Sequence, residues 1–203
     1  MIKWLFFDLG STLIDESECA EYRTRELLKQ RGAPSREILE RRMAELAAQN
    51  RLPYKDAARE FGLQTVKWPY QLEKVYVGVP RILEALSKNY RLGVLANQSA
   101  ETEWRLQKYG ICQYFDLIIS SAEIGFSKPD LKIFEIALDK AGCAPSEAYM
   151  IGDRLDNDIE PATRLGMRTI WVRQGVFAGG SLKLIHHRPD HIVGGIEDIT
   201  EYL

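Results

Sequence analysis

"WLFFDLGSTL" occupies residues 4–13 and decides the fold. Its run of large apolar residues ends at one aspartate, Asp8, and gives way to the turn-forming residues Gly10, Ser11 and Thr12. A short apolar run that is rich in aromatics and bounded by turn residues predicts a strand buried on both faces. A carboxylate at the carboxyl end of such a strand lies where open α/β sheets bind ligands. Asp8 is therefore the first candidate for a functional residue.

The rest of the chain alternates between predicted helices and strands from residue 78 onward. After a first strand over residues 2–8, the predicted strands are "RLGVLA" (91–96), "FDLIIS" (115–120), "AYMI" (148–151), "RTIWV" (168–172) and "HIV" (191–193). The predicted helices between them cover residues 80–89, 99–110 and 129–142, and a fourth ends near Gly166. This alternation predicts an α/β fold, a doubly wound parallel sheet with a Rossmann-like core.

Residues 16–77 have a different character, charged and rich in leucine and alanine, with no convincing strand. The predicted helical segments are "ECAEYRTRELLKQRG" (18–32), "SREILERRMAELAAQN" (35–50) with Ser35 as N-cap, and the shorter "YKDAAREFG" (54–62) and "QLEKVYVG" (71–78). Because the first strand precedes this block, the block is an insertion after strand one. We expect residues 1–14 and 78–203 to form the core, and residues 15–77 to form a small helical cap.

Composition narrows the class of protein. The chain has 203 residues, 28% of them charged and 45% apolar, and a net charge of -2, which gives no reason to expect nucleic acid or an anionic membrane as partner. Cys19, Cys112 and Cys143 lack metal-site spacing and fit reduced thiols. The short N-terminal apolar run argues against a signal peptide, and no stretch is long enough to span a bilayer. We expect a cytoplasmic protein, and no pattern specifies its oligomeric state.

Three more motifs follow predicted strands, as Asp8 does. They are "LANQS" (95–99), "SKPD" (127–130) and "IGDRLDND" (151–158). Because parallel strands end at the same edge of a sheet, Lys128 and the acids Asp153, Asp156 and Asp158 can meet Asp8 there. A carboxylate nucleophile, a lysine and further carboxylates form an oxygen-rich site suited to Mg²⁺ and a phosphate. Aspartate is an established nucleophile toward phosphoryl groups.

The order and spacing of these motifs resemble the haloacid dehalogenase (HAD) superfamily, mostly magnesium-dependent phosphatases. "FFDLGSTL" (6–13) is similar to the family's "DxDGTL" motif, "SKPD" to its lysine motif and "GDRLDND" (152–158) to its acidic "GDxxxxD" motif. The predicted cap after strand one also fits. The resemblance covers nearly the whole chain.

The resemblance implies a role for each matching residue. Asp8 would be the nucleophile and a metal ligand, and Lys128 would steady both the nucleophile and the phosphate. Asp153 would hold the metal. Asp158 would be the second acid, preferred to Asp156 by spacing, which leaves Asp156 as a charge at a helix N-terminus.

Two positions depart from the family pattern. Gly10 stands where the family has a second aspartate, which protonates the leaving oxygen and later activates water. Glycine keeps the backbone carbonyl that the family uses as a metal ligand. Ala96 stands where the family has a serine or threonine that donates to the phosphate. Asn97 and Gln98 are candidates for substrate or phosphate binding, with turn and cap roles as alternatives.

The loss at position 10 affects the expected rate. Positioned acid–base catalysis is worth ~10²–10⁴ in rate, so its loss from a median turnover of about 10 s⁻¹ leaves about 10⁻¹ to 10⁻³ s⁻¹. Two rescues are open. Asp15 or Glu16, at the junction of core and cap, could supply the missing acid. Alternatively, a substrate with a good leaving group, such as an acyl phosphate, would need little protonation.

We therefore expect a hydrolase, a magnesium-dependent phosphatase that acts on a small phosphorylated metabolite through an aspartyl-phosphate at Asp8. The cap would close over the site and select the substrate. One alternative is a catalytically impaired phosphate- or metal-binding or regulatory protein. A less favoured one is a 2-haloacid dehalogenase, because that branch works without metal and does not share the "GDxxxxD" motif. Outside the site, we expect Trp104 and Trp171 in the core and His186, His187 and His191 in a solvated loop.

Overall fold

The computed structural model describes residues 1–203 and contains a six-stranded parallel sheet with strand order β5-β4-β1-β6-β7-β8. Its strands are β1 (Trp4–Phe7), β4 (Arg91–Ala96), β5 (Leu117–Ser120), β6 (Ala148–Gly152), β7 (Arg168–Val172) and β8 (His191–Val193). From β1 the chain proceeds outward to β4 and β5, then crosses to β6 on the other side of β1. The predicted doubly wound α/β fold is confirmed. The reversal of direction lies between β1 and β6, where such folds bind ligands.

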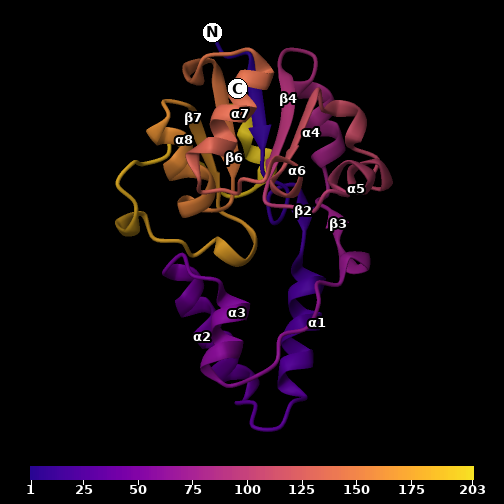
Figure 1. The fold of residues 1–203 in the computed structure, drawn as a ribbon, viewed down its shortest axis with the longest axis vertical. Coiled ribbons are helices and arrows are strands. Elements are labelled where there is room, and N and C mark those ends of the chain that lie inside the picture. Colours follow the sequence, from indigo (N-terminus) through magenta and orange to yellow (C-terminus); the bar gives the residue numbers. More distant parts are fainter.

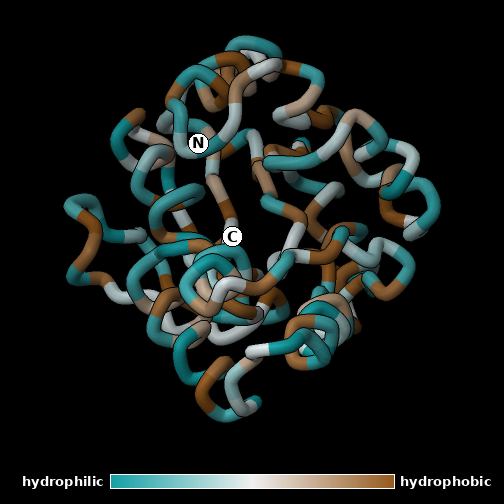
Figure 2. The backbone as a smooth tube through the Cα atoms, turned by 60° about the horizontal axis from the view of Figure 1, so that its bottom comes forward, coloured by the Kyte–Doolittle hydropathy of each residue, from teal (hydrophilic) through white to brown (hydrophobic).

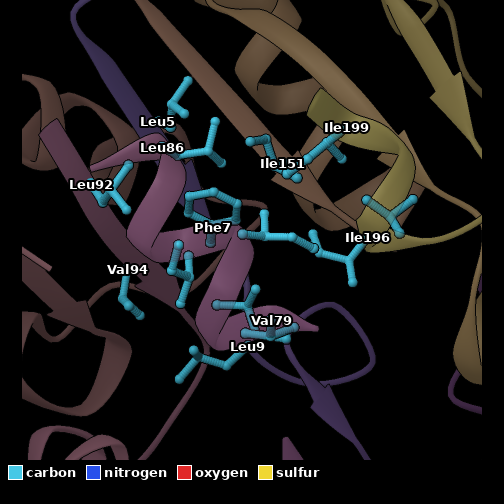
Figure 3. Packing of buried hydrophobic residues seen from close by; sticks show 14 of the residues in the cluster. Leu5, Phe7, Leu9, Val79, Leu86, Leu92, Val94, Ile151, Ile196 and Ile199 are labelled. Atoms are coloured by element: carbon cyan, nitrogen blue, oxygen red, sulfur yellow. The ribbon is translucent and has the colours of Figure 1, made fainter. Parts of the chain in front are cut away.

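The central strand β1 is buried on both faces, as its apolar run predicts. Leu5 and Phe7 belong to the larger core cluster, whose members around Phe7 are drawn in Figure 3, and Trp4 and Phe6 belong to a second cluster. Side chains of successive residues point to opposite faces of a strand, so the two clusters lie on the two faces of the sheet. Burial of one such side chain contributes about 1.5–3 kcal/mol.

Helices cover both faces of the sheet. The larger cluster includes side chains of α4 (Val79–Leu86) and α5 (Thr102–Lys108), and the second includes α7 (Leu131–Ala141) and α8 (Glu160–Arg164). The remaining helical elements of this part are short: η2 (Cys112–Tyr114), α6 (Ser121–Ile124), η3 (Pro145–Glu147), η4 (Leu155–Ile159), η5 (Gly175–Phe177), η6 (Leu182–Leu184) and η7 (Ile196–Glu201).

Three helices lie apart from the sheet, beyond the edge where β1 ends (Figure 1). They are α1 (Ser17–Leu28), α2 (Arg36–Ala48) and α3 (Pro53–Glu60). The Ser35 side chain accepts a hydrogen bond from the backbone N–H of Ile38, which confirms the predicted N-cap of α2. The three helices share a small apolar cluster of their own. We propose on this basis that residues 15–77 form the cap and residues 1–14 and 78–203 the core.

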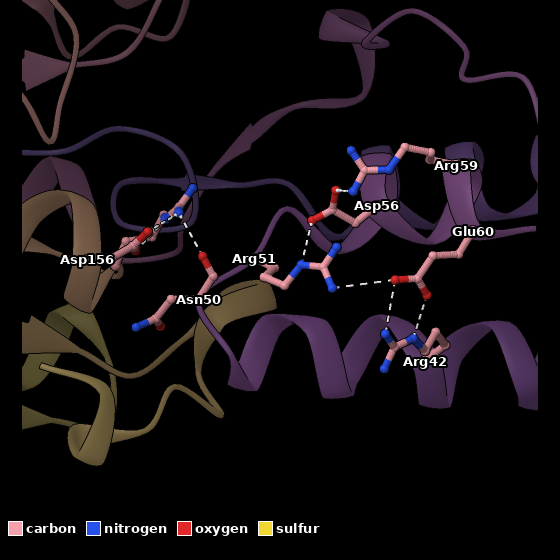
Figure 4. Close-up of polar contacts among 8 residues, drawn as sticks. Arg42, Asn50, Arg51, Asp56, Arg59, Glu60 and Asp156 are labelled. Carbon is pink, nitrogen blue, oxygen red and sulfur yellow. Dashed lines mark hydrogen bonds and ion pairs between the residues drawn. The ribbon is translucent and has the colours of Figure 1, made fainter.

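Ion pairs on the cap surface connect α2 with α3 (Figure 4). Arg42 bonds Glu60 at 2.6 Å, and Arg51 contacts both Asp56 at 3.1 Å and Glu60 at 3.5 Å. Arg59 also forms an ion pair with Asp56, at 2.7 Å. Exposed pairs of this kind contribute little singly, so the apolar cluster remains the main source of cap stability.

A two-stranded antiparallel ribbon joins the sheet to the cap helices. It pairs β2 (Ile14–Asp15) with β3 (Lys74–Val75). The prediction of helix over residues 71–78 and of no strand in the cap is wrong here: a short helical turn, η1 (Tyr70–Leu72), is followed by β3. Pairing with a distant segment supplies hydrogen bonds that the local pattern cannot reveal.

The two tryptophans that the sequence places in the core differ in burial. Trp171 is buried in β7, as predicted, whereas the prediction of a core Trp104 is wrong, because its residue is 61% exposed on α5. The Lys108 ammonium lies 5.7 Å from the centroid of the Trp104 ring, which covers part of that apolar surface. A helix can carry apolar residues on its outer face, so the residue type alone did not determine the direction of the Trp104 side chain.

The three cysteines are free thiols. Hydrophobic and hydrophilic segments alternate along the tube in Figure 2 without a long hydrophobic run. In keeping with this, none of the helices combines the length and the apolar character needed to cross a membrane.

Candidate active site at the carboxyl edge of the sheet

A cleft of about 640 Å³ opens between the carboxyl edge of the sheet and the cap helices, a volume typical of small-molecule sites. The predicted site residues all line it: Asp8, Gly10, Asn97, Gln98, Lys128, Asp153 and Asp158. The structure therefore brings together residues that are far apart in the sequence, on either side of the point where the strand order reverses.

Lys128 bridges two carboxylates in the depth of the cleft. Its Nζ donates to Asp8 Oδ1 at 2.6 Å and to Asp158 Oδ1 at 2.5 Å. The lysine side chain is only 1% exposed. Burial alone lowers the pKa of Lys128, but the charges of Asp158 and Asp8 outweigh it and raise the pKa above the ordinary value. The ammonium is therefore charged and fixed against the Asp8 carboxylate.

Asp8, Asp153 and Asp158 form a compact acidic cluster. Each offers one carboxylate oxygen, and these oxygens lie within 4.8 Å of one another. Burial raises the pKa of Asp8 to about 6, although Lys128 opposes the shift. Burial and the charge of Asp8 raise the pKa of Asp153 well above its ordinary value. One buried lysine does not neutralise three carboxylates, of which Asp153 and Asp158 are buried and Asp8 is partly buried, so this oxygen donor set fits a hard divalent cation such as Mg²⁺.

Hydrogen bonds that the sequence does not predict hold the two acids, Asp153 and Asp158, of the loop after β6. Trp171 Nε1 donates to the Asp153 carbonyl at 2.8 Å, and the Arg154 N–H donates to Asp158 Oδ2 at 3.0 Å. A Cβ on Gly152 would lie 2.4 Å from Asp158 Oδ2. Glycine at 152 is therefore required for the Asp158 carboxylate to fold back beneath Lys128.

Asp156 stands outside this cluster. The Arg154 guanidinium bonds Asp156 at 2.5 Å and reaches the Asn50 carbonyl of the cap at 3.5 Å. Asn50 and Asp156 are both labelled in Figure 4, where dashed lines mark their contacts. Asp156 thus orients an arginine at the contact between core and cap.

The side chains of Asn97 and Gln98 form hydrogen bonds with other residues of the protein. Asn97 Nδ2 donates to the Lys128 carbonyl at 2.8 Å, and the Lys128 N–H donates to Asn97 Oδ1 at 2.7 Å. Gln98 Oε1 accepts from Arg105 at 2.6 Å. Asn97 therefore holds the backbone of Lys128 through both of its amide atoms. Ala96 packs in the larger core cluster and brings no polar atom to the cleft.

Glu16 fills the space beside Gly10. Its Oε1 lies 2.7 Å from the position that a Cβ on Gly10 would take, and the Ser11 hydroxyl donates to its Oε2 at 3.2 Å. Burial, followed by the charges of Asp8 and Glu73, raises the pKa of Glu16 to about 7. A carboxyl group therefore stands beside the position where the family has its second aspartate.

The neighbouring acid, Asp15, is used differently. Its Oδ1 accepts a hydrogen bond from the Ser17 N–H at 2.9 Å, at the start of α1. Asp15 is absent from the lining of the main cleft. Of the two acids named from the sequence as replacements, the structure brings only Glu16 to the site.

Sequence reasoning missed Gln174, which holds the loop after β1. Its Nε2 donates to the carbonyls of Ser11 and Thr12 at 2.9 and 2.8 Å, and its Oε1 accepts from the Ile196 N–H at 3.1 Å. More than 160 residues separate Gln174 from Ser11 and Thr12 in sequence, so no local signal could have found these contacts.

A buried polar group behind the cleft was also missed. Glu73 accepts from Arg105 at 2.6 Å, from Trp68 Nε1 at 2.6 Å and from the Tyr109 hydroxyl. Arg105 also holds Gln98. These contacts connect the cap ribbon, the cap residue Trp68 and the loop after β4.

The family description "Haloacid dehalogenase-like hydrolase" matches residues 5–172 of the chain. The chain belongs to this family. The resemblance read from the motifs and the expectation of a hydrolase are thereby confirmed.

Among curated members of the HAD-like family, the chain is 36% identical over 120 residues to the glyceraldehyde 3-phosphate phosphatase of Methanothermobacter thermautotrophicus, an alignment that covers 59% of the chain and 50% of that relative. It is 29% identical to the enzyme of the same name from Methanocaldococcus jannaschii, with 87% of each chain covered. A HAD phosphatase from Thermococcus onnurineus has the same fold, with a TM-score of 0.67, 22% identity, and 98% and 97% of the two chains covered. The first of these matches spans only half of its relative, and the structural match shows the fold alone.

Proposed function

We propose that this HAD-like hydrolase is a magnesium-dependent phosphatase that acts on a small phosphorylated metabolite through an aspartyl-phosphate at Asp8. The observation that carries the proposal is the Lys128 ammonium, fixed between Asp8 and Asp158 within a cluster of buried acids. The phosphatase names of the relatives support it.

In the first step, one oxygen of the Asp8 carboxylate attacks the phosphorus of the ester. The bond between phosphorus and the ester oxygen breaks, and the leaving alkoxide takes a proton. Lys128 holds the Asp8 carboxylate in place and offers positive charge to the phosphoryl oxygens. The cap helices exclude water from the cleft during this step.

In the second step, water attacks the phosphorus of the aspartyl-phosphate, which releases inorganic phosphate and restores the Asp8 carboxylate. Because Gly10 has no side chain, the proton for the leaving group must come from elsewhere. Glu16 supplies it in the first step and takes a proton from the attacking water in the second. The support is its position: it lines the cleft with Asp8 and stands beside Gly10.

Asp8, Asp153, Asp158 and the backbone carbonyl of Gly10 would hold the magnesium ion. When bound, it would neutralise the repulsion between the Asp8 carboxylate and an anionic phosphate and stabilise charge in the transition state. The family's phosphatases are generally metal-dependent, and the excess of buried carboxylates over lysine supports the same requirement here.

Hydrolysis of a panel of phosphate monoesters and acyl phosphates, with and without Mg²⁺, tests the proposal. Turnover that needs Mg²⁺ and disappears in Asp8→Asn supports it, and Asp156→Asn is the matched control, since Asp156 belongs to the same motif but pairs with Arg154. Turnover equal in wild type and Asp8→Asn would overturn it. Beryllium fluoride binding without turnover would instead favour a phosphate-binding protein, and metal-free chloride release from 2-haloacids a dehalogenase.

A further inference from the structure

Arg23, on α1, is a cation in the cleft without a counterion. Its guanidinium carbon lies 3.4 Å from the centroid of the Tyr54 ring and 5.1 Å from that of Trp68. No carboxylate lies within 4.0 Å of it, and its buried Nε has no hydrogen-bond partner. Burial lowers the pKa of Arg23, and the smaller opposing effects of Tyr54 and of the Glu16 charge do not cancel it.

The other basic residues that line the cleft differ from Arg23. Lys128 is bound to Asp8, and Arg154 is bound to Asp156. Lys55 is exposed to solvent. Arg23 is thus the half-buried cation of the cleft that has no ion-pair partner and an unpaired Nε.

The two rings that hold Arg23 are themselves fixed. The Tyr54 hydroxyl accepts from the Val66 N–H at 2.9 Å, and Trp68 Nε1 donates to Glu73 Oε1 at 2.6 Å. The guanidinium is therefore stacked on rings that cannot turn freely, and little freedom is lost when its edge binds a ligand. A stacked guanidinium presents parallel N–H donors that match a planar carboxylate in a two-point contact.

We propose that Arg23 binds a carboxylate of the substrate while the substrate's phosphate lies against Asp8 and Lys128. The inference rests on the proposed phosphatase function and deepens it: the substrates are phosphate esters of small carboxylic acids rather than of neutral sugars or nucleosides. Negative charge at both ends of the substrate matches the two cationic groups, Lys128 on the core side and Arg23 on the cap side.

A matched pair of esters tests this proposal. 3-Phosphoglycerate and glycerol 3-phosphate differ in a carboxylate against a hydroxymethyl group. One two-point contact to a charged group predicts that wild type prefers the acid by about 10- to 100-fold in kcat/KM, mainly through KM. Arg23→Gln is expected to bring the ratio close to one, and Arg23→Lys to restore it in part. Arg25→Gln, on the exposed side of α1, keeps the wild-type ratio.

Thermal unfolding of each variant confirms that it folds. The proposal is overturned if wild type shows no preference for the acid, or if Arg23→Gln reduces kcat/KM equally for both esters. It is also overturned if Arg23 recognises a second phosphate instead of a carboxylate. In that case wild type, but not Arg23→Gln, prefers fructose 1,6-bisphosphate over fructose 6-phosphate and shows no preference for 3-phosphoglycerate.

Failure of the phosphatase proposal is distinguishable from failure of this one. If no ester is hydrolysed, the phosphatase function fails, and titration calorimetry of 3-phosphoglycerate and glycerol 3-phosphate decides the role of Arg23. Selective binding of the acid that is lost in Arg23→Gln supports the carboxylate site, and equal binding of both compounds overturns it.

Discussion

The Glu16 carboxylate occupies the space next to Gly10, with its Oε1 2.7 Å from the place of an absent Cβ. A side chain at position 10 and Glu16 in its present position therefore exclude each other. The glycine at position 10 is therefore what leaves room for the Glu16 carboxyl group.

Glu16→Gln is expected to reduce kcat for an alkyl phosphate by about 10²- to 10⁴-fold, the usual worth of a positioned acid–base group. In the step that forms the aspartyl-phosphate, the loss should be smaller for an acyl phosphate, whose leaving group needs no proton. Asp15→Asn is the control and should stay within about threefold of wild type, because the Asp15 side chain only accepts a hydrogen bond from the Ser17 N–H and does not line the cleft. Equal losses for the two kinds of leaving group in the step that forms the aspartyl-phosphate, measured in single turnovers, would contradict proton donation by Glu16.

Gly10→Asp should lower activity in the wild-type background, because the new side chain collides with Glu16. In the Glu16→Ala background the same change should raise kcat, since the space is then free and an aspartate can take over the proton transfer. A double-mutant cycle in kcat measures this coupling. Additive effects of the two changes would show that positions 10 and 16 act independently.

The pKa values predict how stability depends on pH in the metal-free protein. The pKa of Glu16 is raised from 4.5 to about 7 and that of Asp8 from 3.8 to about 6, so the folded protein keeps protons that the unfolded chain has released. The contribution of these groups to the free energy of unfolding therefore falls as pH rises from about 4 to 7, and is constant above that. Urea denaturation in chelator at several pH values measures it.

Glu16→Gln serves as the comparison for this pH series. The free energy of unfolding of the variant, minus that of wild type, should increase between about pH 4.5 and 7. A flat difference over this window would show that Glu16 titrates as an ordinary exposed carboxylate.

Mg²⁺ should stabilise the folded protein, because it offsets repulsion among Asp8, Asp153 and Asp158. At a concentration 100 times its Kd, binding adds about 2.7 kcal/mol, or roughly 5–10 °C in Tm for a chain of this size. Asp153→Asn should remove most of the shift in thermal unfolding, while Asp156→Asn should retain it. The same shift in both variants would place the ion elsewhere.

Lys128→Met should destabilise the protein by about 3–5 kcal/mol at pH 8 in chelator, because it leaves the buried carboxylates of Asp8 and Asp158 without their cation. The exposed Lys132, which pairs with Glu135 at 3.2 Å, provides the control. Lys132→Met should cost less than about 1 kcal/mol. Similar small losses in urea denaturation for both variants would mean that the buried acids are neutral.

Periodicity and motif order were sufficient for the sheet and for the group of residues at its edge. The run that ends at Asp8 and the acids after β6 lie at strand ends, so a parallel sheet brings them together whatever the details of the loops. The roles within that group were less accessible. For Asn97 the sequence left substrate binding and a turn or cap role open. Its amide bonds the backbone of Lys128, a contact that depends on how two loops approach each other.

The errors concern features set by contacts between distant segments. The pairing of Val75 with Ile14 created a strand where the local pattern favoured helix, and the direction of Trp104 depends on which face of α5 the sheet leaves uncovered. Glu16 was one of two acids named from the sequence, and only the approach of its side chain to Gly10 separates it from Asp15.

The pairing of Ile14 with Val75 means that the chain leaves the sheet and returns to it at one place. The segment between these two residues is an insertion at the end of a two-stranded hairpin, a position where insertion and replacement are tolerated. Asp8 and Lys128, which we propose to hold the phosphate, lie outside this segment, whereas Arg23 and Glu16 lie inside it. Exchange of this segment would therefore replace the proposed substrate-recognition group and the proposed proton donor together, while the register of the sheet is left untouched.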